Sequence, residues 1–336
     1  MRQRALAPTS LMISEIGFGC GRLASIFQNS EALRTLLEAH DRGITFYDTA
    51  DIYGQGRSEE MLGKAFKGKR HSTIIATKAG YQLSTVGSIG AKLRPVLRPV
   101  VKRLAWFRRS VQSAVSSQKQ QNFSPEYLQR AIDQSLRRLQ TDYIDIFLLH
   151  SPDPAVIESA DWLPALERAK AQGKIRYYGI SCLSIADSSA CMKISGVSCV
   201  QVPVNLIEKD GLDSLIEAGS AGKIGVLARQ PLASGLLAKP LAELRPMDFP
   251  WDRKEFDSKV AKLRASRDLS GCGGRTMAHA ALRYALQLKG IGSIVLGMSS
   301  REHLRENLSL VHEACLTEVE SDQITAIRSD SHLSQT

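Results

Sequence analysis

The sequence predicts one α/β domain of 336 residues, in which eight parallel strands close into a (β/α)8 or TIM barrel. Segments typical of strands alternate with segments typical of helices along almost the whole chain. The strand segments are apolar on both faces, as parallel strands covered by helices are. Eight strand–helix steps without a linker between two halves fit a closed barrel better than an open doubly wound sheet.

The first half of the chain supplies four of these strands. Ser58, followed by Glu59 and Glu60, indicates the capped start of a helix, because acids in the first turn complement the helix dipole. Ser124 and Pro125 indicate a second such start. The expected strands span residues 15–21, 44–49, 72–78 and 144–150, and the expected helices span 30–42, 58–67 and 125–139.

The second half repeats the alternation with one interruption. This interruption is a polar excursion over 238–274, which contains three prolines and the run GCGG. The expected strands span 175–181, 199–205, 223–229 and 293–298, and the expected helices span 162–172, 184–194, 211–221, 276–289, 300–311 and 316–329.

A long insert, residues 80–123, follows the third predicted strand. It contains Pro95, Pro99 and the polar tract SSQKQQN, and a loop of this length is typically a lid or a mobile insert. Its position after a strand end favours a lid over a functional site. Between Lys92 and Arg109 the insert carries seven basic residues and no acid, which favours a solvated face over a phosphate-binding patch.

Composition excludes several classes of protein. The net charge of +10 and pI near 9.4 do not by themselves indicate a nucleic-acid partner, and none is expected. No apolar run approaches the ~20 residues of a membrane helix, and the N-terminus lacks the pattern of a signal peptide, so we expect a cytoplasmic protein without a membrane partner. The six cysteines are scattered without a CxxC pair, so we expect buried core residues and no metal site.

Four chemically active residues follow three neighbouring predicted strands. Asp48 and Tyr53 follow the second strand, Lys78 ends the third, and His150 ends the fourth. Each has an ordinary structural interpretation alone, as a turn acid, a loop aromatic, a cation at a strand tip or a core histidine. Because the functional face of such a barrel lies at the carboxyl ends of its strands, we expect the four to share one pocket.

These residue types suit one task. A tyrosine with a pKa near ~10 is a poor acid at neutral pH, but a neighbouring ammonium stabilises the phenolate, and a carboxylate keeps that ammonium charged. Histidine orients a carbonyl oxygen by hydrogen bonding. Such a set protonates a carbonyl while a hydride donor attacks its carbon. The stretch GFGCGR (17–22) fails the Rossmann fingerprint at Arg22, so a nicotinamide site must be built differently.

Five further motifs, in this order over nearly the whole chain, resemble the aldo-keto reductase family. They are DTADIYGQGRSEEMLG (48–63), YIDIFLLH (143–150), GKIRYYGIS (173–181), PLASGLL (231–237) and VLGMSSREHLRENL (295–308). The resemblance is strongest to bacterial members akin to potassium-channel β subunits and aldose dehydrogenases. It implies that Tyr53 is the general acid or base, that Lys78 and Asp48 tune it, and that His150 orients the carbonyl.

The resemblance also implies an extended NADP(H) at the barrel mouth. The implied nicotinamide-side residues are Cys20, Gly21, Asp48, Ser181, Cys182, Gln201 and Arg229, with Ser181 and Gln201 on the carboxamide. The implied phosphate and adenine residues are Pro231, Leu232 and Gly235 along the pyrophosphate, Gly297, Ser299, Arg301 and His303 around the 2′-phosphate, and Glu306 and Asn307 on the adenine.

Three positions depart from the family pattern. Cys182 stands where many members have asparagine or arginine, which removes one nicotinamide contact. Arg229 replaces an aromatic that often stacks on the nicotinamide, and its charge suits a phosphate or an anionic substrate. His303 replaces glutamine or arginine, which leaves NAD(H) as an alternative cofactor.

The expected function is therefore an NADP(H)-dependent oxidoreductase that interconverts an aldehyde or ketone and the alcohol. An NAD-dependent sugar (aldose) dehydrogenase and a cofactor-binding regulatory β-type subunit with little turnover remain as alternatives. The physiological substrate, the preferred direction and the oligomeric state do not follow from the sequence.

Overall fold

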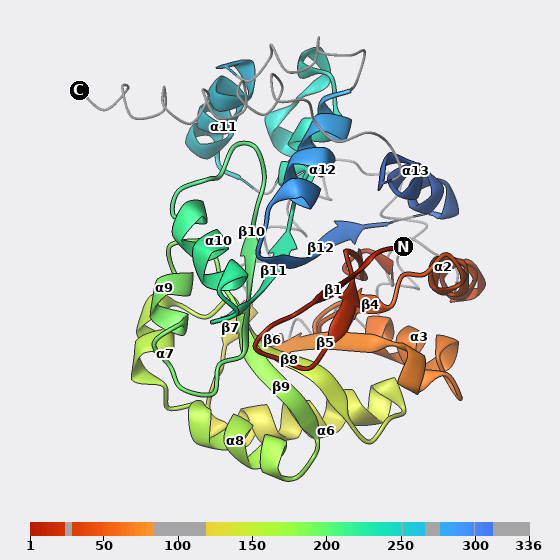
Figure 1. Ribbon diagram of the computed structural model, residues 1–336, viewed down its shortest axis with the longest axis vertical. Coiled ribbons are helices and arrows are strands. Elements are labelled where there is room, and N and C mark those ends of the chain that lie inside the picture. Colours follow the sequence, from red (N-terminus) through yellow and green to blue (C-terminus); the bar gives the residue numbers. More distant parts are fainter. Residues whose placement is uncertain (24–28, 84–118, 250, 266–275, 299, 312–336) are drawn as a thin grey trace.

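A computed structural model describes residues 1–23, 29–83, 119–249, 251–265, 276–298 and 300–311. Eight parallel strands form a closed barrel, which confirms the predicted fold class (Figure 1). Each strand pairs with the next, and the last pairs with the first. The barrel strands are β3 Ile16–Gly19, β4 Phe46–Asp48, β5 Ile74–Ala79, β8 Ile144–His150, β9 Ile175–Ser181, β10 Cys199–Pro203, β11 Gly225–Arg229 and β12 Ile291–Gly297.

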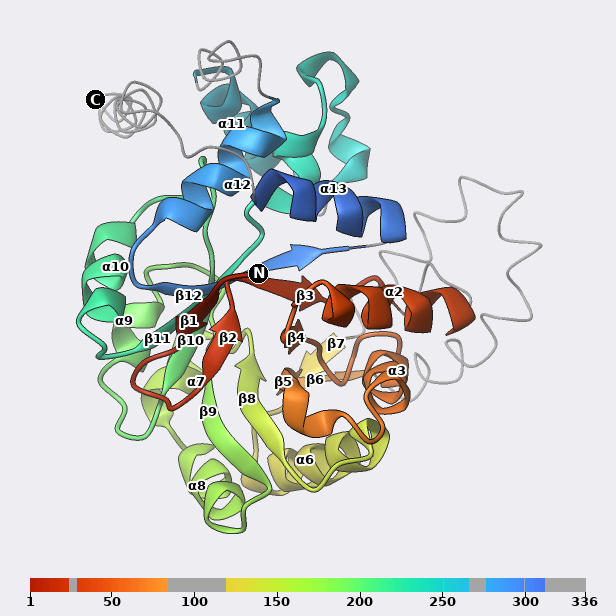
Figure 2. The same cartoon turned by 45° about the vertical axis from the view of Figure 1, so that its right-hand side comes forward.

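Helices surround the barrel on its outer side (Figure 2). Most lie where the sequence predicts them, and none of those described is long and apolar enough to cross a membrane. They are α2 Asn29–Asp41, α3 Arg57–Ala65, α6 Pro125–Leu139, α8 Leu163–Ala171, α9 Ser188–Cys191, α10 Leu212–Ser220, α12 Met277–Gln287 and α13 Arg301–Val311.

The two predicted helix starts have different outcomes. The Ser124 hydroxyl accepts a hydrogen bond from the Tyr127 amide (3.4 Å) and caps α6, as predicted. The predicted cap of α3 is wrong, because α3 begins after Gly56, which has a φ of 87°. A left-handed residue at this turn favours glycine. Ser58 instead lies inside the helix, where its hydroxyl accepts from the Thr49 hydroxyl (2.8 Å).

A hairpin that the sequence analysis did not predict closes the amino end of the barrel. Its strands are β1 Gln3–Ala5 and β2 Met12–Ser14. The apolar side chains of Leu6, Leu11 and Ile13 pack against the inward-facing residues of the barrel strands. Because this end is filled with apolar side chains, a polar site is confined to the carboxyl ends of the strands.

The polar excursion contains a helix that the sequence analysis did not predict. Helix α11 spans Arg253–Ala265, and its buried residues Phe256, Val260 and Leu263 lie on one face. Short elements precede it: η2 Ala233–Ala238, η3 Leu241–Glu243 and η4 Pro246–Asp248. Two further short helices, η1 Arg70–Ser72 and α7 Pro154–Ser159, were also not predicted.

The insert after β5 begins and ends in a hairpin. Strand β6 Tyr81–Leu83 pairs antiparallel with β7 Lys119–Gln121. Residues 84–118, which include the basic run 92–109, lie outside the described residues, as does the predicted helix 316–329. The interpretation of the insert as a lid therefore stays a prediction.

Candidate active site

The barrel register turns three of the predicted residues toward the axis. Side chains alternate between the two faces of a strand, so a residue two positions after an inward one also faces inward. The inward-facing apolar residues of β4, β5 and β8 include Phe46, Ala76 and Leu148. Asp48, Lys78 and His150 each follow two positions later, at the carboxyl ends of their strands.

Lys78 and Asp48 form a buried ion pair. The Lys78 ammonium donates to Asp48 Oδ1 (2.7 Å) and to the Thr49 carbonyl (2.9 Å), and its side chain is 1% exposed. Burial is the largest single influence and lowers the pKa of Lys78, but the electrostatic effects of Asp48 and Tyr53, together with the hydrogen bond to Asp48, outweigh it and raise that pKa above its ordinary value. The lysine therefore stays charged inside the barrel.

Tyr53 stands between this ion pair and His150. The Lys78 Nζ lies 5.2 Å from the centre of the Tyr53 ring, and the Tyr53 and His150 rings meet edge to face with centroids 5.8 Å apart. Burial raises the pKa of Tyr53, and the Lys78 ammonium opposes that rise. The predicted lowering by Lys78 is present but smaller than the effect of burial, so the phenol holds its proton.

A second polar pair adjoins the same carboxylate. The Gln201 side-chain amide donates to Asp48 Oδ1 (2.8 Å), and the Ser181 hydroxyl donates to Gln201 Oε1 (3.1 Å). Both side chains are buried, Ser181 at the carboxyl end of β9 and Gln201 in the middle of β10. A hydroxyl and an amide side by side match the donors and acceptors of a carboxamide.

Three glycines leave room around these groups. A Cβ at Gly21 would lie 3.6 Å from the Tyr53 ring, while a Cβ at Gly235 or Gly297 would meet nothing within 4 Å. Gly235, which follows Pro231 and Leu232, has a φ of 98°. The backbone at these positions is thus open to a flat ring or to phosphates.

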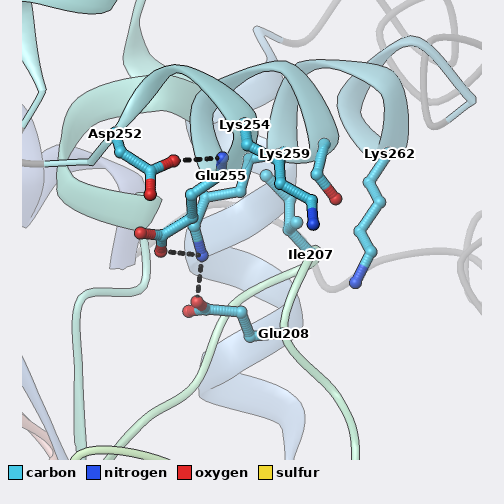
Figure 3. A pocket seen from close by; sticks show the side chains of 8 residues that line it. Ile207, Glu208, Asp252, Lys254, Glu255, Lys259 and Lys262 are labelled. Atoms are coloured by element: carbon cyan, nitrogen blue, oxygen red, sulfur yellow. Dashed lines mark hydrogen bonds and ion pairs between the residues drawn. The ribbon is translucent and has the colours of Figure 1, made fainter.

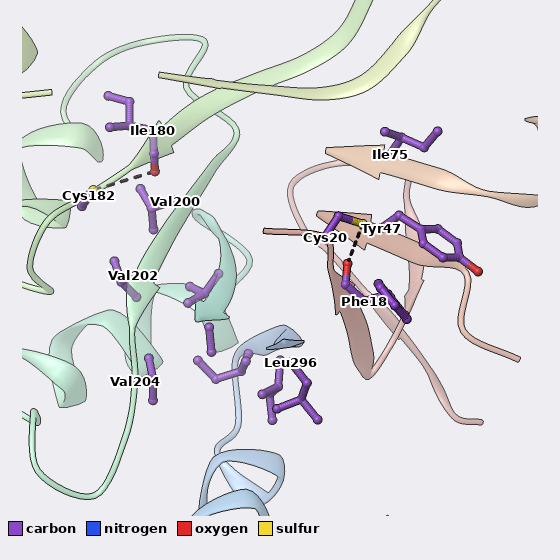
Figure 4. Packing of buried hydrophobic residues seen from close by; sticks show 14 of the residues in the cluster. Phe18, Cys20, Tyr47, Ile75, Ile180, Cys182, Val200, Val202, Val204 and Leu296 are labelled. Atoms are coloured by element: carbon purple, nitrogen blue, oxygen red, sulfur yellow. Dashed lines mark hydrogen bonds between the residues drawn. The ribbon is translucent and has the colours of Figure 1, made fainter. Parts of the chain in front are cut away.

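Cys20 lies beside this site without pointing into it. Its side chain belongs to the outer apolar core, where the thiol donates to the Phe18 carbonyl (3.6 Å) (Figure 4). Its backbone amide donates to the Asp48 carbonyl (2.9 Å). Any contact that Cys20 makes with the site is therefore made by its main chain.

Arg229 connects the ends of two strands. Its guanidinium donates to the carbonyls of Cys182 (2.8 Å) and Leu183 (3.3 Å) and to the side chain of Gln230 (2.5 Å). Burial lowers the pKa of Arg229, and Tyr53 lies close enough to act on it electrostatically. The arginine therefore places positive charge beside the tyrosine while it fixes the loop after β9.

The arginine of the predicted 2′-phosphate group lies against α2. Arg301 Nε donates to Glu38 Oε2 (2.5 Å) and Arg305 Nε donates to Glu38 Oε1 (2.7 Å). These arginines lower the pKa of Glu38 to about 2. His303 and Glu306 are exposed, Asn307 is half-buried, and Ser299 lies outside the described residues. The Ser300 hydroxyl accepts from the His303 amide (3.0 Å) and caps the helix.

Sequence reasoning missed Tyr81, which contacts one of the predicted four, and the hydrogen-bonded pair Tyr127 and Asp51. The Tyr81 ring meets the His150 ring edge to face, with centroids 4.9 Å apart. The Tyr127 hydroxyl donates to Asp51 Oδ2 (3.3 Å) and to the Tyr81 carbonyl (3.4 Å), which joins the Tyr53 loop to the insert. Asp51 lies within the quoted motif, but Tyr81 belongs to the insert, whose pattern carries no comparable signal.

A cavity of about 340 Å³ lies apart from these residues, between α11 and the loop after β10 (Figure 3). Three of its charged side chains pair with one another, since Lys259 contacts both Glu208 and Glu255. Its lining residues are Ile207, Glu208, Asp252, Lys254, Glu255, Ser258, Lys259 and Lys262. None is a predicted site residue. No group of three or more potential metal ligands occurs among the described residues.

A parallel eight-stranded barrel with a buried lysine–aspartate pair, a tyrosine and a histidine at its carboxyl end defines a class of oxidoreductase. The chain belongs to the aldo/keto reductase family, whose model matches residues 15–329. The resemblance predicted from the motifs is thus confirmed.

Individual relatives cover nearly the whole chain. The uncharacterized oxidoreductase YqkF of Bacillus subtilis is 31% identical, over 98% of this chain and 96% of that protein. L-galactose dehydrogenase of Arabidopsis thaliana is 30% identical, over 92% and 88% of the two chains. The holo form of the aldo-keto reductase AKR11C1 from Bacillus halodurans matches with a TM-score of 0.76 at 28% identity, over 97% and 96%.

Proposed function

We propose that the protein uses NADP(H) to interconvert an aldehyde or ketone and the corresponding alcohol, with Tyr53 as the general acid or base. The observation that carries this proposal is the convergence of Tyr53, His150 and the Lys78–Asp48 ion pair at the carboxyl end of the barrel. Family membership supports the oxidoreductase class.

Each side chain has a distinct part in the proposed reduction. The bound cofactor supplies hydride to the carbonyl carbon. The Tyr53 hydroxyl donates its proton to the carbonyl oxygen, and the Lys78 ammonium stabilises the phenolate that remains. Asp48 keeps Lys78 charged, and His150 binds the carbonyl oxygen beside Tyr53. In the oxidative direction the Tyr53 phenolate takes the proton back.

The residues at the mouth fit a nicotinamide cofactor. Ser181 and Gln201 match a carboxamide, and the open backbone at Gly235 and Gly297 suits a pyrophosphate. Arg301 at the start of α13 suits a 2′-phosphate, because arginine binds phosphate with two parallel donors and a helix start presents free amides. The relative yakc of Schizosaccharomyces pombe, 32% identical, carries NADP(+) in its name.

An NAD-dependent sugar dehydrogenase is the second candidate. Two relatives favour it by name, L-galactose dehydrogenase and, at 26% identity, D-threo-aldose 1-dehydrogenase of a Pseudomonas species. A regulatory subunit with little turnover is the third. The complete set Asp48, Tyr53, Lys78 and His150 argues against it, since binding alone needs no proton donor.

A panel of aldoses, small aldehydes and ketones with both cofactors tests the three candidates. We expect turnover of carbonyls with NADPH, measured as a decrease in the absorbance of the reduced nicotinamide. Oxidation of aldoses with NAD alone would favour the sugar dehydrogenase. Cofactor binding without turnover of any substrate would favour the regulatory subunit.

A further inference from the structure

Two cysteines from different elements lie side by side in the outer core. Cys182 follows β9, Cys191 ends α9, and their sulfur atoms are 3.5 Å apart. Both are fully buried, and Cys182 packs among Ile180 and Val200 (Figure 4). The structure describes four cysteines, all with free thiols, and thiol–thiol contact occurs between these two.

The pair adjoins the proposed carboxamide site. Cys182 directly follows Ser181, and its amide donates to the Gln201 carbonyl (2.8 Å). Its own carbonyl accepts from the Arg229 guanidinium (2.8 Å). A displacement of Cys182 would therefore be transmitted to Gln201 and Arg229, although the Cys182 thiol points away from the site.

We propose that Cys182 and Cys191 form a reversible oxidation site, and that their disulfide weakens binding of the nicotinamide cofactor. The effect on binding rests on the proposed function, whereas disulfide formation does not. With hydrogen peroxide as oxidant, one thiolate attacks a peroxide oxygen, giving a sulfenic acid and hydroxide. The second thiol displaces the sulfenic oxygen. The two thiols lose two electrons and two protons, and the peroxide becomes two waters.

The local geometry permits this step. A disulfide bond is ~2.05 Å long, so the sulfur atoms must approach each other by about 1.5 Å. Helix α9 has only four residues and connects through loops at both ends, which allows that movement. The flanking residues Leu183 and Met192 are 50% and 37% exposed, so the pair lies just below the surface. Local opening of such a short element admits a small oxidant.

The rate should depend on pH. The hydrogen bond with Cys191, together with burial, raises the pKa of the Cys182 thiol. Because the thiolate is the reactive form, oxidation is slow at neutral pH and accelerates as the pH rises.

The test treats the full-length protein with hydrogen peroxide and measures intact mass, non-reducing peptide maps and NADPH affinity. We expect the mass to fall by two hydrogens, a Cys182–Cys191 crosslinked peptide, and NADPH affinity at least tenfold weaker. Dithiothreitol should reverse all three changes, which separates them from methionine oxidation. Cys191→Ser and Cys191→Ala should bind NADPH normally and keep that affinity after peroxide. Cys199→Ala, the matched buried control, should behave like the wild type.

Two results would overturn the inference. Unmodified or singly oxidised cysteines, or a crosslink to another cysteine, would show that the pair does not close. A disulfide that leaves NADPH affinity unchanged would show that the pair does not act on the site. If the reduced protein binds no nicotinamide cofactor at all, the proposed function fails, while the mass measurement still decides whether the disulfide forms.

Discussion

A single oxygen of Asp48 joins two polar groups from opposite parts of the barrel. Asp48 Oδ1 accepts from Lys78 Nζ at 2.7 Å and from Gln201 Nε2 at 2.8 Å. Lys78 belongs to the proposed proton-transfer group and Gln201 to the proposed carboxamide site. The carboxylate therefore holds Lys78 and Gln201 in a fixed position relative to each other.

Asp48→Asn should destabilise the protein more than the same substitution of an exposed aspartate would. It leaves the Lys78 ammonium buried without its counter-ion, and breaking a buried pair costs about 3–5 kcal/mol. Lys78→Met combined with Asp48→Asn should recover part of that loss, because no charge then stays buried. Denaturant unfolding of both single variants and the double variant measures this coupling. Additive losses would contradict a direct interaction.

Tyr53→Phe should lower kcat by about 10²–10⁴-fold, the range that general acid–base catalysis contributes. The variant keeps the ring that contacts His150, so cofactor affinity and unfolding free energy should stay close to those of the wild type. Tyr47→Phe is the matched control, since the Tyr47 hydroxyl donates to the Ile44 carbonyl in the core. Wild-type turnover in Tyr53→Phe would show that Tyr53 is not the general acid or base.

Asp51 should make stability depend on pH. Burial, with a contribution from Glu59, raises the pKa of Asp51 from 3.8 to about 7. The folded state then binds the proton more tightly than the unfolded chain, so this contribution to stability is complete below about pH 4 and is lost as the pH rises through about 7. Asp51→Asn should flatten the dependence in urea titrations across this range, and the exposed control Asp153→Asn should not.

Strand cores were predictable because they are nearly continuous apolar runs, as in IDIFLLH of β8, where Asp145 is the one acid. The β1–β2 hairpin was not, because its three-residue strands have no alternation to detect. The shared position of Asp48, Lys78 and His150 was predictable because each lies at the carboxyl end of a predicted barrel strand. The bond between Gln201 and Asp48 spans 153 positions, so it depends on barrel closure and no local pattern contains it. The same holds for the contact of Glu38 with Arg301.

Arg301→Ala should separate the two cofactors. A hydrogen bond to a charged group contributes about 1.5–3 kcal/mol, so we expect NADPH affinity to fall roughly 10- to 100-fold and NADH affinity to change little. Arg305→Ala is the matched control, because Arg305 also pairs with Glu38 but lies one helical turn further from the start of α13. Fluorescence titration of both variants with both cofactors measures the ratio. An equal loss of NADPH and NADH affinity would instead show that Arg301 supports α13 against α2 and does not bind the 2′-phosphate.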